Sequence, residues 1–243
     1  AGAGVVVSAE TSQERWVSAL RSAVEAQVPV LVLADGALEF RNSWRNPRLV
    51  DGAVYRPVLG HKLACLGASQ CRHVESWGNP GRCELVGFPA FDRYLDHPVP
   101  PLPRSGTWRL LVASAKTPFF DAAQRAIAIE QVRALNDALK AFAAHAPCAV
   151  EVTWRLTGEL RELFGVTGAV QPLSVPIHEG LVGADAVIAT PSTVVIEAML
   201  ANRPVAQLDF FNTPHYQQTE WTISAPSHIE DVLSGLLEPT DAR

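Results

Sequence analysis

The chain has 243 residues, of which 48% are hydrophobic, and its formal net charge is −5. This length allows a sizeable core in one large domain or in two small ones. The acidic balance excludes the basic signature of a nucleic-acid-binding protein, and no apolar run of about 18 residues could span a membrane. The opening residues, AGAGVVVSAE, lack the basic start of a signal peptide and predict a strand, and the missing initiator methionine leaves a trimmed or partial sequence open.

Cysteine and histidine spacing gives no sign of a metal site. None of the four cysteines forms a C-x-x-C pair, and the seven histidines form no H-x-x-x-H pair. A chain with this much core needs no disulfides, so we expect reduced, mostly buried thiols in a cytoplasmic protein. We also expect no metal and no cofactor. The cysteines are Cys65, Cys71, Cys83 and Cys148.

The first half of the chain alternates short apolar strands with helices. Continuously apolar strands of this kind predict a parallel sheet that is covered on both faces. Ser12 is a suitable N-cap for the first helix. In chain order, we expect a strand at 5–7, a helix at 12–27, a strand at 30–34, a strand at 63–66, a helix at 68–77 and a strand at 83–86.

A proline-rich stretch divides the chain. Four prolines fall within six residues, 98–103, and favour a stiff, extended connector over a helix or a central strand. We therefore predict an N-terminal domain at 1–98, a linker at 99–107 and a C-terminal domain at 108–243.

The second half repeats the alternation of strands and helices. Right-handed βαβ connections give each half a Rossmann-like sheet, so the predicted fold class is α/β with two Rossmann-like domains. We expect strands at 109–113, 149–154, near 169–170, at 186–189 and at 205–208, and helices at 121–144, near 160, ending near 183, after 190–193 and at 227–237.

Ligands of open parallel α/β sheets bind beyond the carboxyl ends of the strands. In the second half, the turn Thr190-Pro-Ser192-Thr193 occupies such a position and leads into a helix, whose free N–H groups and dipole favour an anion. Glu197 follows four residues after Thr193, about 6 Å along the helix axis. This spacing suits a phosphate at the helix tip and a ribose diol one turn further on. The alternative is that Ser192 only caps the helix and that Glu197 pairs with Arg203 or another cation.

Other polar residues also follow predicted strands. Ser114, Lys116 and Arg155 lie at the same expected edge, where either cation could neutralise a phosphate, although a solvated lysine and a structural salt bridge are open alternatives. In the first half, Asp35 ends a strand and could accept a proton from an acceptor hydroxyl, with Glu39 as the competing base. Asp35 could instead cap its own loop.

Two segments resemble GT-B glycosyltransferases. The stretch 184–205, ADAVIATPSTVVIEAMLANRPV, is similar to the carboxy-terminal signature of that family, and 83–92, CELVGFPAFD, resembles the segment that closes the first domain in CDP-glycerol-type and Kdo-type surface-polysaccharide transferases. The resemblance covers most of the chain. It departs from the family at 154–157, WRLT, where many relatives have a His-Pro pair, and in the shortness of the first domain.

The resemblance implies two domains facing a central cleft, a nucleotide-sugar donor and a glycan or lipid-linked acceptor. Ser192 and Thr193 would hold the donor phosphates and Glu197 would hold the ribose, with Thr190 also in the donor-binding site. Asp35 would be the base of a metal-independent, inverting transfer. Peripheral contact with the inner face of a membrane is a further option. The rival interpretations are a CDP-glycerol-type polyol-phosphate transferase, a nucleotide-sugar 2-epimerase and a non-catalytic nucleotide-binding protein.

Overall fold

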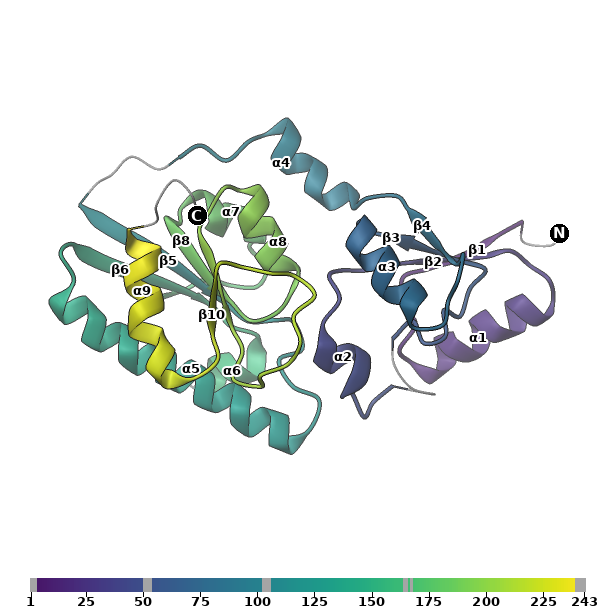
Figure 1. The fold of residues 1–243 in the computed structure, drawn as a ribbon, viewed down its shortest axis with the longest axis horizontal. Helices are drawn as coiled ribbons and strands as arrows, with labels where there is room; N and C mark the ends of the chain where they lie inside the picture. The colour runs from purple at the N-terminus through teal and green to yellow at the C-terminus, as the bar shows by residue number, and fades with distance from the viewer. Residues whose placement is uncertain (1–3, 50–53, 102–105, 164–165, 167, 239–243) are drawn as a thin grey trace. The chain divides into compact units, whose positions relative to one another are not determined.

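The structure, a computed structural model, describes residues 4–49, 54–101, 106–163, 166 and 168–238. Tertiary contacts divide the chain into two compact units, Ala1–Ala90 with Pro214–Tyr216 and Phe91–Thr213 with Gln217–Arg243. Each unit contains one parallel β-sheet with helices packed on it (Figure 1). The predicted fold class, α/β with two Rossmann-like domains, is confirmed.

The first unit contains a four-stranded sheet in the order β1-β2-β3-β4, and every neighbouring pair is parallel. The strands and the helices between them match the predicted alternation, with one addition, the short helix α2, which the sequence analysis took as loop. The elements are β1 (Val6–Ser8), α1 (Glu14–Glu25), β2 (Val30–Leu33), α2 (Phe40–Trp44), β3 (Lys62–Cys65), α3 (Ala68–Ser76) and β4 (Cys83–Leu85).

Helices cover one face of this first sheet. Each strand is added on the same side of the one before it, so right-handed crossovers place the connecting helices on a single face. There Leu20 of α1 and Val74 of α3 pack with Val32 in one core. On the opposite face Val7 and Leu33 are exposed. The expectation of a sheet covered on both faces is therefore wrong for the described part of this unit, because an apolar run alone cannot show how many faces are buried.

The predicted N-cap of the first helix is also wrong. Helix α1 begins at Glu14, and its N-cap residue is Gln13. The backbone N–H and the hydroxyl of Ser12 both donate to Glu10 Oε1, at 2.7 and 2.5 Å. Ser12 therefore belongs to a local turn before the helix, a competing use of a short polar side chain.

The second unit contains a six-stranded parallel sheet in the order β10-β9-β8-β5-β6-β7. Two of its elements, α4 and β10, were not predicted. The elements are α4 (Asp92–Asp96), β5 (Thr107–Ala113), α5 (Ala122–His145), β6 (Ala149–Arg155), α6 (Gly158–Leu163), β7 (Ala169–Val170), α7 (Ile177–Val182), β8 (Ala186–Ala189), α8 (Thr193–Leu200), β9 (Val205–Leu208), β10 (Trp221–Ile223) and α9 (Ile229–Leu237).

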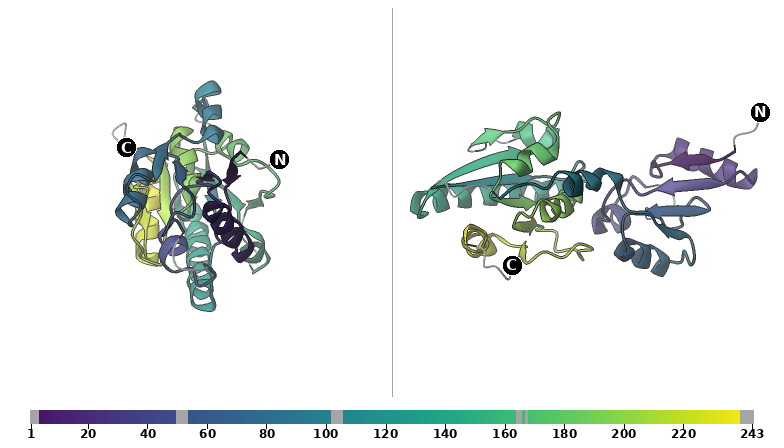
Figure 2. Two further views of the ribbon diagram at one scale, coloured as in Figure 1. Left: turned by 90° about the vertical axis from the view of Figure 1, so that its right-hand side faces the viewer. Right: turned by 90° about the horizontal axis from the view of Figure 1, so that it is seen from above.

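Both faces of the second sheet are covered. Successive residues of a strand point to opposite faces. Leu110 and Val112 of β5 accordingly pack in a core with residues of α5 and α9. Leu111 and Ala113 pack in another core with residues of α4, α7 and α8. The second unit is thus a three-layer α/β/α sandwich, and Figure 2 shows its long helix α5 from two further directions.

The contacts place the segment before the proline-rich stretch in the second unit, whereas the sequence analysis placed residues up to 98 in the first. Tyr94 of α4 packs in the second unit's core, and the carbonyl of Pro100 accepts a hydrogen bond from Arg203 Nη2 at 2.7 Å. Proline content predicts an extended chain, but it does not say which core that chain packs on. Residues 102–105 of the predicted linker lie outside the described residues.

Candidate functional site

The strand order of the second sheet contains a topological switch point. From β5 the chain continues to β6 and β7 on one side, and then returns to β8, β9 and β10 on the other. Strands β5 and β8 are parallel neighbours. Because α5 and α8 pack on opposite faces of the sheet, the loops that follow the two strands leave it in opposite directions. Such a point at the carboxyl edge is where open α/β sheets bind ligands. Ser114, Lys116 and the turn 190–193 follow these two strands.

A hydrogen bond joins the two loops at the switch point. The backbone N–H of Ala115, which follows β5, donates to Thr190 Oγ1 at 2.7 Å. Thr190 is buried, so this bond lies in the interior of the second unit. Ser114 accepts a hydrogen bond from the backbone N–H of Thr157 at 2.9 Å, which ties the loop after β5 to the loop after β6 as well.

Ser192 occupies the N-cap position of α8 but its side chain does not cap the helix. Its hydroxyl donates to the carbonyl of Thr190 at 2.9 Å. The alternative in which Ser192 only caps the helix therefore lacks its hydrogen bond. The amino end of α8, which begins at Thr193, keeps its positive dipole end directed at the switch point.

Glu197 lies one turn into α8 and its carboxylate meets a tyrosine. Tyr94 donates its hydroxyl to Glu197 Oε2 at 2.6 Å. The alternative partner, Arg203, instead donates to the carbonyls of Leu181 at 3.1 Å and Pro100 at 2.7 Å. Arg203 thus holds the end of α7, as a cation at a helix carboxyl end does.

Arg155 ends β6 and holds a turn of the protein itself. Its Nη1 donates to the carbonyls of Pro172 and Val175 at 3.1 and 2.7 Å, and its Nη2 donates to Leu173 at 3.3 Å. Burial lowers the pKa of Arg155, and the negative charge of Glu197 partly offsets that shift. The guanidinium therefore acts on Glu197 through its charge while three of its contacts are structural.

The surroundings of Lys116 fit both a cation that meets a ligand and the alternative of a solvated lysine. It lies exposed in the loop after β5. Within the residues that the structure describes, its ammonium forms no ion pair. Of the two predicted cations, Lys116 is thus the one whose charge is available at the switch point.

The two candidate bases lie in the first unit and differ in their partners. Asp35 follows β2 and is exposed, and its backbone N–H is hydrogen-bonded to the hydroxyl of Tyr55. Glu39 forms an ion pair with Arg41, which is buried. The ion pair gives Glu39 a structural role.

The sequence analysis missed Tyr94 and Thr157. Tyr94 lies 103 residues before its partner Glu197, and no local pattern connects the two. Thr157 lies shortly after the predicted strand at 149–154, on the same side of the sheet as Ser114. Its place at the carboxyl edge was a usable signal for a residue that organises the site.

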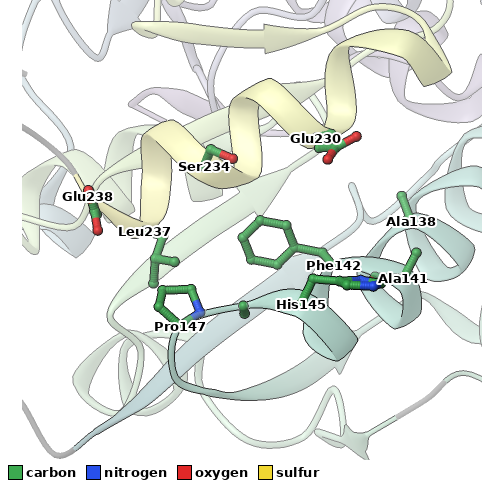
Figure 3. Close-up of a pocket in the computed structure, with 10 residues that line it drawn as sticks. Ala138, Ala141, Phe142, His145, Pro147, Glu230, Ser234, Leu237 and Glu238 are labelled. Carbon is green, nitrogen blue, oxygen red and sulfur yellow. The ribbon is translucent and has the colours of Figure 1, made fainter.

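A groove of the second unit lies away from these residues. It has a volume of about 630 Å³ and runs between the carboxyl-terminal part of α5 and α9 (Figure 3). Phe142 and Leu237 are among the apolar side chains that line it, with Glu230 at one end. Helix α5 ends just before β6 begins, so the groove lies toward the amino ends of the strands. None of the candidate residues lines it.

Among the described residues, no group of three or more His, Cys, Asp or Glu side chains is arranged to hold a metal ion. The four cysteines are free thiols, as expected, although only Cys65 is fully buried. No helix in the described ranges is both long and apolar enough to cross a membrane.

Neither a protein-family model nor a curated protein sequence matches the chain. The fold is similar to that of S. aureus MnaA, solved with UDP, at a TM-score of 0.63 and 11% identity over 96% of this chain and 66% of that one. It is also similar to a UDP-N-acetylglucosamine 2-epimerase candidate from Listeria monocytogenes, at a TM-score of 0.62 and 12% identity over 96% of this chain and 65% of that one.

A structure of the wall teichoic acid polymerase TagF overlaps less well, at a TM-score of 0.49 and 10% identity over 96% of this chain and 80% of that one. The chain spans just under two thirds of the length of the MnaA and Listeria proteins. At identities this low the likeness establishes the fold. The chain therefore has the GT-B-like fold that its sequence resemblance implies, with two α/β units that each contain a parallel sheet.

Proposed function

We propose that the second unit binds the nucleotide part of an activated sugar, and that the chain transfers this sugar to a glycan or lipid-linked acceptor in surface-polysaccharide assembly. The observation that carries the proposal is the switch point between β5 and β8. There the amino end of α8, an available lysine and a carboxylate one turn along the helix lie on neighbouring elements. These are the groups that a phosphate and a ribose require.

The phosphates of the donor would lie at the amino end of α8. Backbone N–H groups and the helix dipole favour the anion. The hydroxyl of Thr193 is proposed to donate to it, and that of Ser192 would do so by exchanging its hydrogen bond to the carbonyl of Thr190 for one to the phosphate. Lys116 supplies a full positive charge from the facing loop. Together these groups would stabilise the departing phosphate as negative charge develops on it, without requiring a divalent metal.

The ribose would lie over Glu197. A carboxylate accepts hydrogen bonds through two oxygens, and Tyr94 occupies one of them. The other oxygen is proposed to accept from the ribose hydroxyls. Arg155 keeps a positive charge near this carboxylate.

In the proposed reaction, a hydroxyl oxygen of the acceptor forms a bond to the anomeric carbon of the sugar. The bond between that carbon and the phosphate oxygen breaks, and the nucleotide leaves with the electron pair. Asp35 is the proposed base that takes the hydroxyl proton. An attack opposite the leaving group inverts the anomeric configuration.

A second candidate function is epimerisation of a nucleotide sugar at C2. The two solved structures with TM-scores above 0.6 favour it, since one was solved with UDP and the other is a UDP-N-acetylglucosamine 2-epimerase candidate. An epimerase needs no acceptor. Incubation with UDP-N-acetylglucosamine alone, followed by chromatography of the nucleotide sugars, would reveal a C2 epimer only in that case.

A thermal-shift screen of nucleotides and nucleotide sugars tests the proposed function first. A ligand that binds only the folded state adds about 2.7 kcal/mol of stability at one hundred times its Kd. We expect UDP, CDP or CMP, or one of their sugar derivatives, to raise the unfolding temperature. If none does so at millimolar concentration, the proposal is contradicted. A higher unfolding temperature without turnover on any acceptor would favour a non-catalytic nucleotide-binding protein. Release of CMP from CDP-glycerol would favour a polyol-phosphate transferase.

A further inference from the structure

Tyr94 belongs to a short helix, α4, that precedes the proline-rich stretch, yet its side chain is part of the second unit's core. Only 4% of the residue is exposed. The ring packs in the same cluster as Val195 and Ala198 of α8. The phenol oxygen therefore has a fixed position relative to the helix that carries Glu197.

A second contact holds α4 against the same layer. Arg93 Nη1 lies 2.8 Å from Nδ1 of His178, which belongs to α7. With Tyr94 bound to α8 and Arg93 to α7, the helix is attached at two neighbouring points of the second unit. Such attachment limits the movement of the phenol.

The hydrogen bond between Tyr94 and Glu197 has the properties of a charge-assisted bond. Its length of 2.6 Å falls within the range of about 2.5–2.7 Å for a hydroxyl that donates to a carboxylate. Burial and the neighbouring carboxylate raise the pKa of Tyr94, so the phenol stays protonated and remains a donor. A glutamate side chain rotates about three bonds, and a buried donor on one oxygen removes most of that freedom.

We propose that Tyr94 is a positioning residue that orients the Glu197 carboxylate for the 2′- and 3′-hydroxyls of a ribonucleotide. This inference rests on the proposed nucleotide site and goes beyond it, because it assigns discrimination between ribose and deoxyribose to a residue outside α8. With Oε2 held by the phenol, Oε1 is directed at the diol. A nucleotide that lacks both hydroxyls gains nothing from this arrangement.

The alternative is that Tyr94 only satisfies its own buried hydroxyl, as buried tyrosines generally do. The two roles differ in one measurable ratio. A structural role lowers the affinity for every nucleotide by the same factor when the hydroxyl is removed. A positioning role lowers the affinity for the ribonucleotide and leaves that for the dideoxynucleotide unchanged.

The experiment uses the full chain and isothermal titration calorimetry with UDP and 2′,3′-dideoxy-UDP, and with the corresponding pair of CDP ligands. For wild type we expect the ribonucleotide to bind at least about tenfold more tightly, the effect of one good hydrogen bond to a charged group. Glu197→Ala should bring the ratio of the two Kd values close to one. Tyr94→Phe, which keeps the ring, should lower the ratio about three- to tenfold and leave the dideoxy affinity unchanged.

A matched control is Tyr55→Phe, which removes the hydroxyl of a buried tyrosine in the first unit and should leave the ratio unchanged. The ratio is internal to each variant, so a partly unfolded preparation affects both ligands equally. Tyr94→Met provides a second variant without a donor.

The outcomes separate the inference from the proposed function. An unchanged ratio in Tyr94→Phe, together with a ratio near one in Glu197→Ala, would overturn the positioning role and leave the nucleotide site intact. An equal loss for both ligands in Tyr94→Phe would assign a structural role. If wild type binds no nucleotide, or binds both forms equally, the ribose assignment fails and the inference fails with it.

Discussion

Both sheets of this chain consist of parallel strands, but only in one of them does the order of strand addition reverse. In the first unit the strand order follows the chain order, β1-β2-β3-β4, so no pair of neighbouring loops diverges at the carboxyl edge. In the second unit the order reverses at β5, and the loops after β5 and β8 diverge there. The difference indicates that topology, before any motif, favours a ligand site in the second unit, where we propose that the nucleotide binds.

The same difference decides how each sheet is covered. A steady progression of right-handed crossovers places all helices on one face, whereas a reversal places them on both. The first sheet therefore exposes Val7 and Leu33, while Leu110 and Leu111 of β5 are buried in opposite cores of the second unit.

The largest effect is expected for a change that tests whether the second unit binds the nucleotide while the first supplies the catalytic base. Asp35→Asn keeps the shape of the side chain and removes the proton acceptor proposed for the first unit. Turnover should fall by about 10²–10⁴-fold, the usual contribution of a general base. The Kd for the nucleotide, measured by calorimetry, should stay unchanged. Normal turnover in this variant would assign the base to another residue.

The next effect compares a strand residue from each sheet. Leu110→Ala opens a cavity in a core that is closed on all sides and should lower the free energy of unfolding by about 2–5 kcal/mol. Val7→Ala, on the exposed face of the first sheet, should change it by no more than about 0.5 kcal/mol. Urea denaturation followed by circular dichroism measures both. Similar losses would mean that the first sheet's second face is covered after all.

A third substitution distinguishes two roles of Ser192, as the N-cap residue of α8 and as part of a phosphate-binding site. Aspartate is as good an N-cap as serine, so Ser192→Asp should leave the stability within about 0.5 kcal/mol of wild type. Its negative charge at the amino end of α8 should weaken the binding of a nucleoside diphosphate about tenfold. A variant with wild-type affinity would show that the phosphates lie elsewhere.

The smallest effect concerns one surface cation in each unit. Lys116→Ala should weaken nucleotide binding about threefold, and less so in high salt, because an exposed charge contributes about 0.2–1 kcal/mol. Lys62, which pairs with Glu84 on the first sheet, provides the control. Lys62→Ala should leave nucleotide affinity unchanged at any ionic strength. Equal losses of nucleotide affinity in the two variants would mean that the overall charge of the protein, and not Lys116 in particular, attracts the nucleotide.

The alternation of strands and helices could be predicted from the sequence because each element carries its own apolar pattern. Short elements of mixed composition could not be predicted in this way. The strand at 221–223 has only three residues, and the helix at 40–44 is polar and aromatic in a stretch that favours loop. The covering of each sheet face also escaped prediction, since it depends on strand order.

The positions of the site residues on the carboxyl edge could be predicted, but their partners could not. Thr190 and Ser192 follow from the rule for parallel sheets. The contacts of Arg155 with carbonyls at 172–175, and the ion pair of Glu39 with Arg41, depend on how loops fold back. The bond between Tyr94 and Glu197 joins residues that only the tertiary structure brings together.

The membership of α4 in the second unit has a practical consequence for anyone who divides this protein at its prolines. A fragment that starts at residue 108 would lose the phenol that fills part of the core and the carbonyl of Pro100 that receives Arg203. A truncation that starts at or before Phe91 would retain both. If the shorter fragment failed to bind nucleotide, the cause would be the removal of these residues, and the result would not test the proposed site.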